Sequence, residues 1–268
     1  MKSSKELIKN IDFLKIIGNI DKNIENIAVD SRKVSKNTLY FAIKGATVDG
    51  HDFIESAIKN GAVVIICSNE LIYFKNYPEI AFIIVENILK IQAIIVNEFY
   101  DYPSKKAKVI GITGTNGKTS STFILESIFK QNGKKVGVIG TIGYKINETL
   151  TKLENTTPNS LELTNIFVEM LNNEVDIIIM EVSSHALELY RVYGVHFDCV
   201  VFTNLTQDHL DFHLTMENYY NAKKKLFTEY MDYSEKENKI CVINTDDFYG
   251  KRLFDEITCK KTSFEKRW

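Results

Sequence analysis

Short apolar runs rich in β-branched residues recur along the chain and alternate with stretches of helical spacing. Runs with the length of buried strands lie at residues 62–67, 81–85, 109–113, 135–139, 175–181, 199–203 and 239–243. Apolar positions at helical spacing lie between or beside them, at residues 87–100, 120–131, 161–172 and 216–230. Such an alternation is typical of a mainly parallel sheet covered by helices, so the pattern predicts an α/β fold.

The same pattern predicts two domains. A polar segment that contains Pro103, at residues 101–106, separates the predicted helix 87–100 from the predicted strand 109–113. A chain of 268 residues has room for about two domains. We therefore predict one domain at residues 1–103 and a second at residues 104–268.

The composition is that of a globular protein with little net charge. Hydrophobic residues make up 44% of the chain, and 33 Lys and Arg balance 35 Asp and Glu, for a net charge of -2. A disordered chain would be less hydrophobic and more highly charged. Because the charges nearly cancel, no overall positive field attracts nucleic acid or an anionic membrane, and any anion site has to be local.

The N-terminal segment and the cysteines bear on the cellular location. Lysines interrupt the apolar stretches of residues 1–20, which are too short for a signal peptide or a membrane span. Cys67, Cys199, Cys241 and Cys259 are scattered singly, without a Cys-x-x-Cys pair. We therefore expect a cytoplasmic protein without membrane insertion, whose cysteines are reduced thiols mainly in the core.

A glycine-rich segment lies between the predicted strand 109–113 and the predicted helix 120–131. It consists of Gly114, Thr115, Asn116, Gly117, Lys118, Thr119 and Ser120. Backbone amides freed by glycines, together with a helix N-terminus, form a site for a triphosphate, to which Lys118 adds a charge and Thr119 a hydroxyl for Mg²⁺. The longer G-x-x-x-x-G-K-[ST] loop would need glycine where Ile112 stands. The alternative is a structural turn with a solvated lysine, but the pattern favours binding of ATP or GTP.

Acidic, histidine and lysine residues follow two other predicted strands. Glu181 ends the strand 175–181, and a segment with two carboxylates and two imidazoles, residues 208–213, follows the strand 199–203. Mg²⁺ prefers oxygen ligands, so Thr119, Glu181 and phosphate oxygens suit one ion, whereas a site that includes His209 needs a further anionic ligand. The alternatives are that the histidines are structural and that residues 223–225, all lysine, form a solvated helix face.

Taken together, these motifs resemble those of the Mur ligase family. The resemblance covers Gly114 to Thr119, Asn155-Thr156-Thr157-Pro158, Glu181-Val182-Ser183-Ser184-His185 and Asp208-His209-Leu210-Asp211. Near the N-terminus, Asp30-Ser31-Arg32 and residues 45–53 resemble the first domain of the branch of that family that makes UDP-N-acetylmuramoyl-tripeptide. The resemblance implies an N-terminal α/β domain that binds a UDP-sugar, followed by a mainly parallel central domain that binds ATP through its phosphate loop.

The resemblance also implies an activity and partners. Enzymes of this branch use ATP and Mg²⁺ to join a diamino acid, meso-diaminopimelate or L-lysine, to UDP-N-acetylmuramoyl-L-alanyl-D-glutamate in peptidoglycan synthesis. The reaction passes through an acyl phosphate, which the amine attacks to give a tetrahedral intermediate. Such chemistry depends on positioning and electrostatics. We expect a monomer that acts as an ATP-dependent amide-forming ligase.

Site residues follow from the resemblance by position. The ATP-binding residues are Gly114, Thr115, Asn116, Gly117, Lys118, Thr119 and Ser120, with Asn244 near the adenine. Thr119 and Glu181 hold one Mg²⁺, while His209 and a carbamylated Lys223 belong to a second, and Lys118, Glu181, His209 and Lys223 carry the catalysis. The UDP-sugar substrate is bound by Val29, Ser31, Ala46, Thr47, Val48, Asn155, Thr156, Thr157, Ser183 and Arg191.

Some features depart from the family pattern. Leu189 replaces a glutamine of some members, and Leu214 replaces a common glycine, which affects the loop near Thr215. The family also has a C-terminal Rossmann-like domain, whereas this chain stops at Trp268 inside the central domain. We therefore expect a truncated central sheet with an exposed edge and impaired turnover. Two alternatives stay open: a non-catalytic module that binds UDP-sugar or ATP, and a ligase resembling folylpolyglutamate synthetase.

Overall fold

The computed structural model describes residues 1–45, 47–68 and 76–265. The chain divides into two compact units, Met1–Phe99 and Tyr100–Trp268. The division lies between residues 99 and 100, whereas the sequence analysis placed it between 103 and 104. Residues Pro103–Lys105 form a short 3-10 helix that belongs to the second unit.

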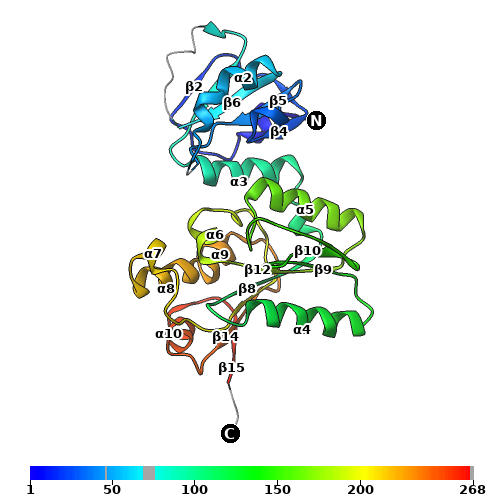
Figure 1. The fold of residues 1–268 in the computed structure, drawn as a ribbon, viewed down its shortest axis with the longest axis vertical. Coiled ribbons are helices and arrows are strands. Elements are labelled where there is room, and N and C mark those ends of the chain that lie inside the picture. The colour runs from blue at the N-terminus through cyan, green and yellow to red at the C-terminus, as the bar shows by residue number, and fades with distance from the viewer. Residues whose placement is uncertain (46, 69–75, 266–268) are drawn as a thin grey trace. The chain divides into compact units, whose positions relative to one another are not determined.

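The first unit is built on a mainly parallel sheet with the strand order β2-β7-β6-β5-β4 (Figure 1). The strands are β2 (Lys15–Ile17), β4 (Asn26–Ala28), β5 (Thr38–Phe41), β6 (Ala62–Cys67) and β7 (Ala81–Ile84). Only β2 pairs antiparallel with its neighbour in this sheet. A small separate sheet pairs β1 (Lys2–Ser3) with β3 (Asn23–Ile24), and the helices are α1 (Ser4–Leu7), α2 (Ile54–Lys59) and α3 (Ile88–Phe99).

The second unit contains a longer sheet with the strand order β11-β10-β9-β12-β8-β13-β14-β15 (Figure 1). The strands are β8 (Lys108–Thr113), β9 (Val136–Gly140), β10 (Gly143–Ile146), β11 (Thr149–Thr151), β12 (Ile177–Glu181), β13 (Cys199–Phe202), β14 (Ile240–Asn244) and β15 (Lys261–Phe264). The strands from β9 to β15 in this order are parallel, and β10 and β11 add an antiparallel hairpin. The predicted α/β class and mainly parallel sheet are confirmed.

Helices cover the two faces of this sheet unequally. On one face, α4 (Lys118–Gln131) packs Leu125 and Phe129 against a cluster that includes Ile112 and Ile179. On the other face lie α5 (Ser160–Asn172), α6 (Ser184–Glu188) and α10 (Phe248–Glu256), over a larger apolar core. Figure 1 shows α4 on the opposite side of the sheet from α5 and α6. The strand β15 forms the edge of the sheet, and its side chains are mostly exposed, as expected for an open edge.

The predicted helix at residues 216–230 is wrong in its length. The structure has α8 (Met216–Lys224), a 3-10 turn at Lys225–Phe227 and a separate short helix, α9 (Glu229–Tyr233). Thr228 interrupts the helix because its backbone angles, φ -116° and ψ -91°, lie outside the helical region. The apolar spacing continues through Thr228, so the sequence pattern does not show the break in the helix.

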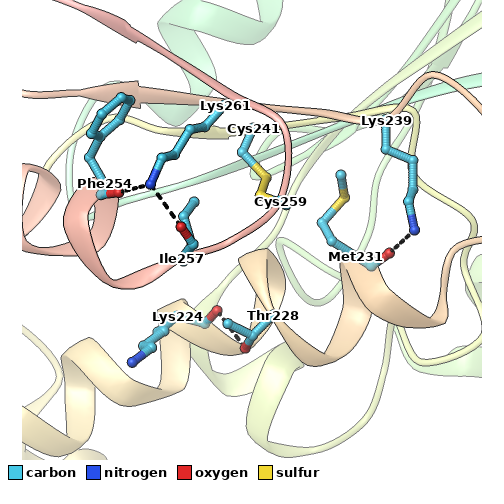
Figure 2. The surroundings of a disulfide bond; sticks show 9 residues. All are labelled: Lys224, Thr228, Met231, Lys239, Cys241, Phe254, Ile257, Cys259 and Lys261. Carbon is cyan, nitrogen blue, oxygen red and sulfur yellow. Dashed lines mark hydrogen bonds between the residues drawn. A yellow bond between two sulfur atoms is a disulfide. The ribbon is translucent and has the colours of Figure 1, made fainter.

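The expectation that all cysteines are reduced is also wrong. Cys241 of β14 and Cys259, which lies between α10 and β15, form a disulfide bond (Figure 2). The two cysteines are 18 residues apart, but β14 and β15 are neighbours in the sheet, and this brings them together. Within the described residues, Cys67 and Cys199 take part in no disulfide bond, and burial raises the pKa of Cys199 to about 11. None of the helices in the described ranges is long and apolar enough to cross a bilayer.

Candidate functional site

The glycine-rich loop joins β8 to α4 at the carboxyl edge of the sheet of the second unit. Gly114 has φ 147° and Gly117 has φ 84°, which side-chain-bearing residues rarely adopt. A Cβ on Gly114 would lie 1.9 Å from the Thr203 hydroxyl, at the end of β13, so the loop also needs glycine for space. Gly117 has open space around it and precedes Lys118, the first residue of α4. The predicted strand, loop and helix are therefore confirmed.

Residues that follow β13 hold the loop in place. The main-chain N–H of Thr115 donates to the Asn204 carbonyl at 2.9 Å, and that of Asn116 donates to the Asn204 side-chain oxygen at 3.0 Å. The Thr203 hydroxyl donates to the Asn116 carbonyl at 2.7 Å. These bonds connect the loop to the neighbouring strand, so its shape is preorganised.

Lys118 folds back over the loop. Its Nζ donates to the carbonyls of Gly114 and Thr115, both at 2.9 Å. Burial lowers the pKa of Lys118, and the charges of Glu181 and Asp208 oppose that shift. The ammonium group is thus held by carbonyls at the helix N-terminus, where an anionic ligand could replace these contacts.

Glu181 is the last residue of β12 and is only 1% exposed. Its Oε1 accepts from the Thr119 hydroxyl at 2.9 Å and from the Thr141 N–H at 3.0 Å, and its Oε2 accepts from the Thr141 hydroxyl at 3.1 Å. The predicted proximity of Thr119 and Glu181 is therefore present. A hydroxyl and a carboxylate side by side are oxygen donors of the kind that Mg²⁺ prefers.

Thr141 is not among the site residues that the sequence motifs predict. Thr141 directly follows β9, and β9 lies beside β12 in the sheet, so the two carboxyl ends meet at the same edge. The strand order was needed to find this contact. The only signal in the sequence was a polar residue two positions after the predicted strand 135–139, separated from it by Gly140.

Lys223 is buried inside the second unit, with 1% of its surface exposed. Its Nζ donates to the Gly114 carbonyl at 3.0 Å and lies 4.6 Å from the centre of the Tyr219 ring. The ion pairs of the described residues do not include Lys223. Burial lowers the pKa of Lys223 well below its usual range, and the charge of Lys118 acts in the same direction. The solvated helix face that the alternative predicted therefore does not include Lys223.

The next two lysines behave as ordinary surface residues. Lys224 pairs with Glu256 at 2.7 Å, and Lys225 pairs with Glu188 at 2.8 Å. Each of these side chains is about one third exposed, at 30–32%. The contrast with their neighbour singles out Lys223.

His209 precedes the short helix α7 (Leu210–His213) and has a left-handed backbone, with φ 51°. Its ring centre lies 5.0 Å from that of His185 and 6.0 Å from that of Tyr219, the ring that Lys223 also contacts. His209 and Lys223 therefore contact the same aromatic ring. In the described part of the chain, no three His, Cys, Asp or Glu side chains gather as metal ligands, so a second cation site is not assembled by such residues alone.

His213 fits the structural alternative. It is 5% exposed, its Nε2 lies 2.8 Å from the Ser184 hydroxyl, and its ring stacks on Tyr219. Burial lowers the pKa of His213 to about 4, with a smaller contribution from the charge of His185. A neutral imidazole in this position packs α6, through Ser184, against α8, through Tyr219.

The predicted substrate residues of the second unit form a connected group around Thr157. The Thr157 hydroxyl donates to the Glu181 carbonyl at 3.0 Å and accepts from the Ser183 N–H at 3.1 Å. Arg191 donates from Nη1 to the Thr157 carbonyl at 2.9 Å. Burial lowers the pKa of Arg191, which still keeps its charge. These contacts connect residues around Thr157 to the Glu181 strand.

Thr156 and Asn155 lie on the same segment. The Thr156 hydroxyl is 3.2 Å from that of Thr141, while Asn155 is exposed. Asn244, the last residue of β14, donates from Nδ2 to the Thr203 carbonyl at 2.8 Å. Asn244 thus lies at the same carboxyl edge as the loop, one strand beyond β13.

The predicted substrate residues of the first unit lie in two turns. Val29 is half-buried and Ser31, 6% exposed, begins a 3-10 helix after β4. Thr47 and Val48 are exposed in the segment after β5, and Ala46 lies outside the described residues.

An aspartate stabilises each of these turns. The Asp30 carboxylate accepts from the Arg32 N–H at 2.9 Å, and that of Asp49 accepts from the His51 N–H at 3.0 Å. Hydrogen bonds from the side chain and the backbone of Arg32 lower the pKa of Asp30 to about 2. Each aspartate therefore caps the 3-10 helix that follows it, Ser31–Lys33 or Gly50–Phe53, and stabilises the adjoining turn locally.

Leu214 takes the conformation that a glycine would take. It has φ 68° and ψ -43°, and the Thr215 N–H donates to the His213 carbonyl at 2.8 Å across it. This is the strained form of a γ-turn. The loop near Thr215 thus keeps a glycine-like shape although its residue is leucine.

Comparison with known proteins identifies relatives for both units. The model of the Mur ligase middle domain matches residues 112–266, and the model described as Mur ligase family, catalytic domain matches residues 23–100. A UDP-N-acetylmuramoyl-L-alanyl-D-glutamate--2,6-diaminopimelate ligase of Clostridium tetani is 47% identical over 97% of this chain and 52% of its own length. The chain spans about half the length of the curated relatives it matches.

Solved structures share the fold. One of a UDP-N-acetylmuramoyl-L-alanyl-D-glutamate--2,6-diaminopimelate ligase superposes with a TM-score of 0.80 and 24% identity, covering 98% of this chain and 52% of its own. The MurF ligase of Thermotoga maritima in complex with ADP gives a TM-score of 0.57 at 23% identity, over 90% of this chain and 49% of its own.

Proposed function

The chain belongs to the Mur ligase family, and we propose that it is the UDP-sugar-binding and ATP-binding part of a MurE-type ligase. The proposed reaction joins a diamino acid, meso-diaminopimelate or L-lysine, to UDP-N-acetylmuramoyl-L-alanyl-D-glutamate at the expense of ATP. Residues 1–103 would bind the UDP-sugar and residues 104–268 the nucleotide. One observation carries the proposal: the glycine loop, the Thr119–Glu181 pair and the buried Lys223 meet at one edge of one sheet.

The loop residues would bind the nucleotide phosphates. Main-chain amides of the loop and of the first turn of α4 point a partial positive charge at an anion. Lys118, which now donates to two carbonyls of the loop, would exchange them for phosphate oxygens. Asn244, on the adjacent strand end, would contact the base. Because the loop is already held by Asn204, little ordering is needed on binding.

The Thr119 hydroxyl and the Glu181 carboxylate fit a Mg²⁺ ion, because both are oxygen donors and they lie 2.9 Å apart. When bound, Mg²⁺ would neutralise charge on the phosphate oxygens during transfer. The chain itself would orient the Glu181 carboxylate through the hydrogen bonds that it accepts from Thr119 and Thr141. His209 and Lys223 would hold a second ion.

Lys223 would become an anionic ligand by carbamylation. A neutral amine adds to CO₂ through its nitrogen lone pair and releases one proton, which leaves a carbamate. The low pKa of Lys223 favours that neutral amine, since burial penalises the ammonium form. The carbamate would supply the anionic oxygen that a site with His209 requires. Lys224 and Lys225, which form surface ion pairs, would not react.

The substrate carboxylate would be activated at the same edge. Transfer of the ATP γ-phosphoryl group to the glutamate carboxylate gives an acyl phosphate, and attack of the amine expels phosphate and forms the amide. Arg191 and the group around Thr157 would position the anionic substrate, since a guanidinium binds carboxylates and phosphates well. We place this activity in the cytoplasm, where ATP and UDP-sugars are available.

Calorimetry tests the proposal on the full 268-residue chain. We expect UDP-N-acetylmuramoyl-L-alanyl-D-glutamate to bind, and Arg191→Ala to weaken binding by at least about tenfold, because a charge-assisted contact is lost. Arg252→Ala is the matched control, because Arg252 pairs with Glu217 at the surface, and it should bind like the wild type. A folded chain that does not bind this substrate would overturn the proposed substrate site.

A further inference from the structure

The Glu181 carboxylate is held by two residues, only one of which lies in the phosphate loop. Thr141 contacts both carboxylate oxygens, through its main-chain N–H at 3.0 Å and its hydroxyl at 3.1 Å. We infer that Thr141 is a positioning residue of the nucleotide–metal site, which fixes the plane of the Glu181 carboxylate and connects it to the substrate segment at Thr156. This inference rests on the proposed function.

The pattern of hydrogen bonds favours this role. Oε1 accepts from both Thr119 and Thr141, whereas Oε2 accepts from Thr141 alone among the described residues. A carboxylate oxygen has two accepting positions, so Oε2 keeps one for a cation. Because Thr141 contacts both oxygens, it restricts rotation of the Glu181 carboxylate about the Cγ–Cδ bond. The remaining position of Oε2 therefore has a fixed direction.

Gly140, the residue before Thr141, is shaped around the same carboxylate. A Cβ on Gly140 would lie 2.2 Å from Oε1 of Glu181 and 2.8 Å from its carboxyl carbon. The φ of Gly140 is not in the left-handed region, so this position needs glycine for space. Residues 140 and 141 thus act on Glu181 by two independent means, a gap and a pair of donors.

Thr141 also contacts the segment that carries the proposed substrate residues. Its hydroxyl lies 3.2 Å from that of Thr156 and 3.1 Å from Oε2 of Glu181. Thr141 is exposed, so its side chain adds little to the core. A hydroxyl in this place that contacts both a carboxylate and a second loop serves the site more than the stability of the fold.

Calorimetric titration of ADP in Mg²⁺ and in EDTA tests the inference on the full chain. Thr141→Val removes the hydroxyl at nearly constant volume and should reduce the gain in ADP affinity caused by Mg²⁺ by about tenfold, which is typical for the loss of a partner of a metal ligand. Thr141→Ser keeps the hydroxyl and should keep the gain. Affinity in EDTA should be the same for all three proteins, because the phosphate loop is intact.

Gly140→Ala provides a second, steric test, since its Cβ displaces the carboxylate and should also reduce the gain. A purely structural role would lower the thermal midpoint of Thr141→Val and leave the Mg²⁺ gain unchanged, and this result would overturn the inference alone. A folded wild-type chain that binds no ADP in Mg²⁺ would overturn both the inference and the proposed nucleotide site.

Discussion

The two ends of the parallel strands in the second unit carry charges in opposite ways. At the amino ends of β8, β13 and β14, charged side chains pair with one another, as in Lys105–Glu235 at 2.7 Å and Lys108–Asp198 at 2.9 Å. At the carboxyl ends, Glu181 and Lys223 are buried and are held by hydroxyl, amide and carbonyl groups. The charges at the amino ends are thus compensated by opposite charges, while Glu181 and Lys223 take part in none of the ion pairs of the described residues.

A cavity lies at the end of the strands opposite to the proposed site. An open cavity of about 650 Å³ lies at the amino ends, and its lining includes Lys105, Lys108, Asp198 and Glu235. These four residues form ion pairs with each other, so a charged ligand would have to break these pairs to bind to them. These lining charges are thus already paired, whereas Glu181 and Lys223 at the proposed site lie outside the ion pairs of the described residues.

The largest expected effect comes from Gly114→Ala, at the carboxyl edge. Its φ of 147° and the Thr203 hydroxyl 1.9 Å from the new Cβ should lower the free energy of unfolding by about 3 kcal/mol or more. Gly133→Ala, near the amino end of β9, is the matched control: φ is 73° and no atom lies within 4 Å, so we expect a loss of about 1 kcal/mol. Urea denaturation measures both, and equal losses would contradict the close contact.

The next effect concerns a buried histidine near the amino ends. His196 is 0% exposed and accepts from the Glu235 N–H through Nδ1, and burial lowers its pKa to about 4 from 6.5. The unfolded chain therefore binds more protons between pH 6.5 and 4, so the free energy of unfolding falls as the pH falls through this range, by about 2 to 3 kcal/mol from His196.

The variant His196→Asn keeps an acceptor and removes this titration. Relative to its own stability at pH 7, the variant should lose less stability than the wild type between pH 6.5 and 4, as followed by thermal denaturation. Parallel curves for the two proteins would show that His196 does not titrate as its burial predicts.

A smaller, stabilising effect is expected at Leu214, close to the carboxyl-edge site. Glycine relieves the strained φ of 68° at a residue that is 75% exposed, so Leu214→Gly should raise the free energy of unfolding by about 0.5 to 1 kcal/mol. Asn147→Gly serves as the control, because asparagine already tolerates its φ of 55°. Chemical denaturation that gives equal changes for the two variants would argue against strain at Leu214.

The smallest effect belongs to the surface pairs of the amino end. Replacing Lys105 by Met breaks its pair with Glu235, whose side chain is 69% exposed, and should change the free energy of unfolding by about 0.5 kcal/mol or less. Nucleotide affinity should stay the same. A marked loss of affinity in this variant would mean that the amino end takes part in binding.

The long buried strands were predictable, and the short or polar ones were not. Residues 62–67 were predicted from an apolar run that is buried on both faces, and they form β6. The edge strand β15 has the sequence Lys-Thr-Ser-Phe and the hairpin β10–β11 is largely polar, so neither shows the periodicity of a buried strand. A run of apolar residues indicates a buried strand in the sequence, and the strands at the edges of this sheet lack such a run.

The parts of the candidate site that lie within one continuous segment of sequence were predictable. Lys118 and Thr119 follow from the glycine loop, and Glu181 follows from its place at the end of a buried strand. The contact of Thr141 with Glu181 depends on β9 lying beside β12, which the sequence does not encode locally. Lys223 is buried whereas Lys224 is not, and this difference likewise depends on how α8 packs.

The most direct test of the central claim is the affinity of the chain for a non-hydrolysable ATP analogue in Mg²⁺, measured by calorimetry. Lys118→Ala should weaken binding by about 10- to 100-fold, because a charge-assisted contact to phosphate is lost. Lys108→Ala, at the amino end, should leave the affinity unchanged, since Lys108 pairs with Asp198. Equal affinities for wild type and Lys118→Ala, or no binding by the folded wild-type chain, would contradict a nucleotide site at the carboxyl edge.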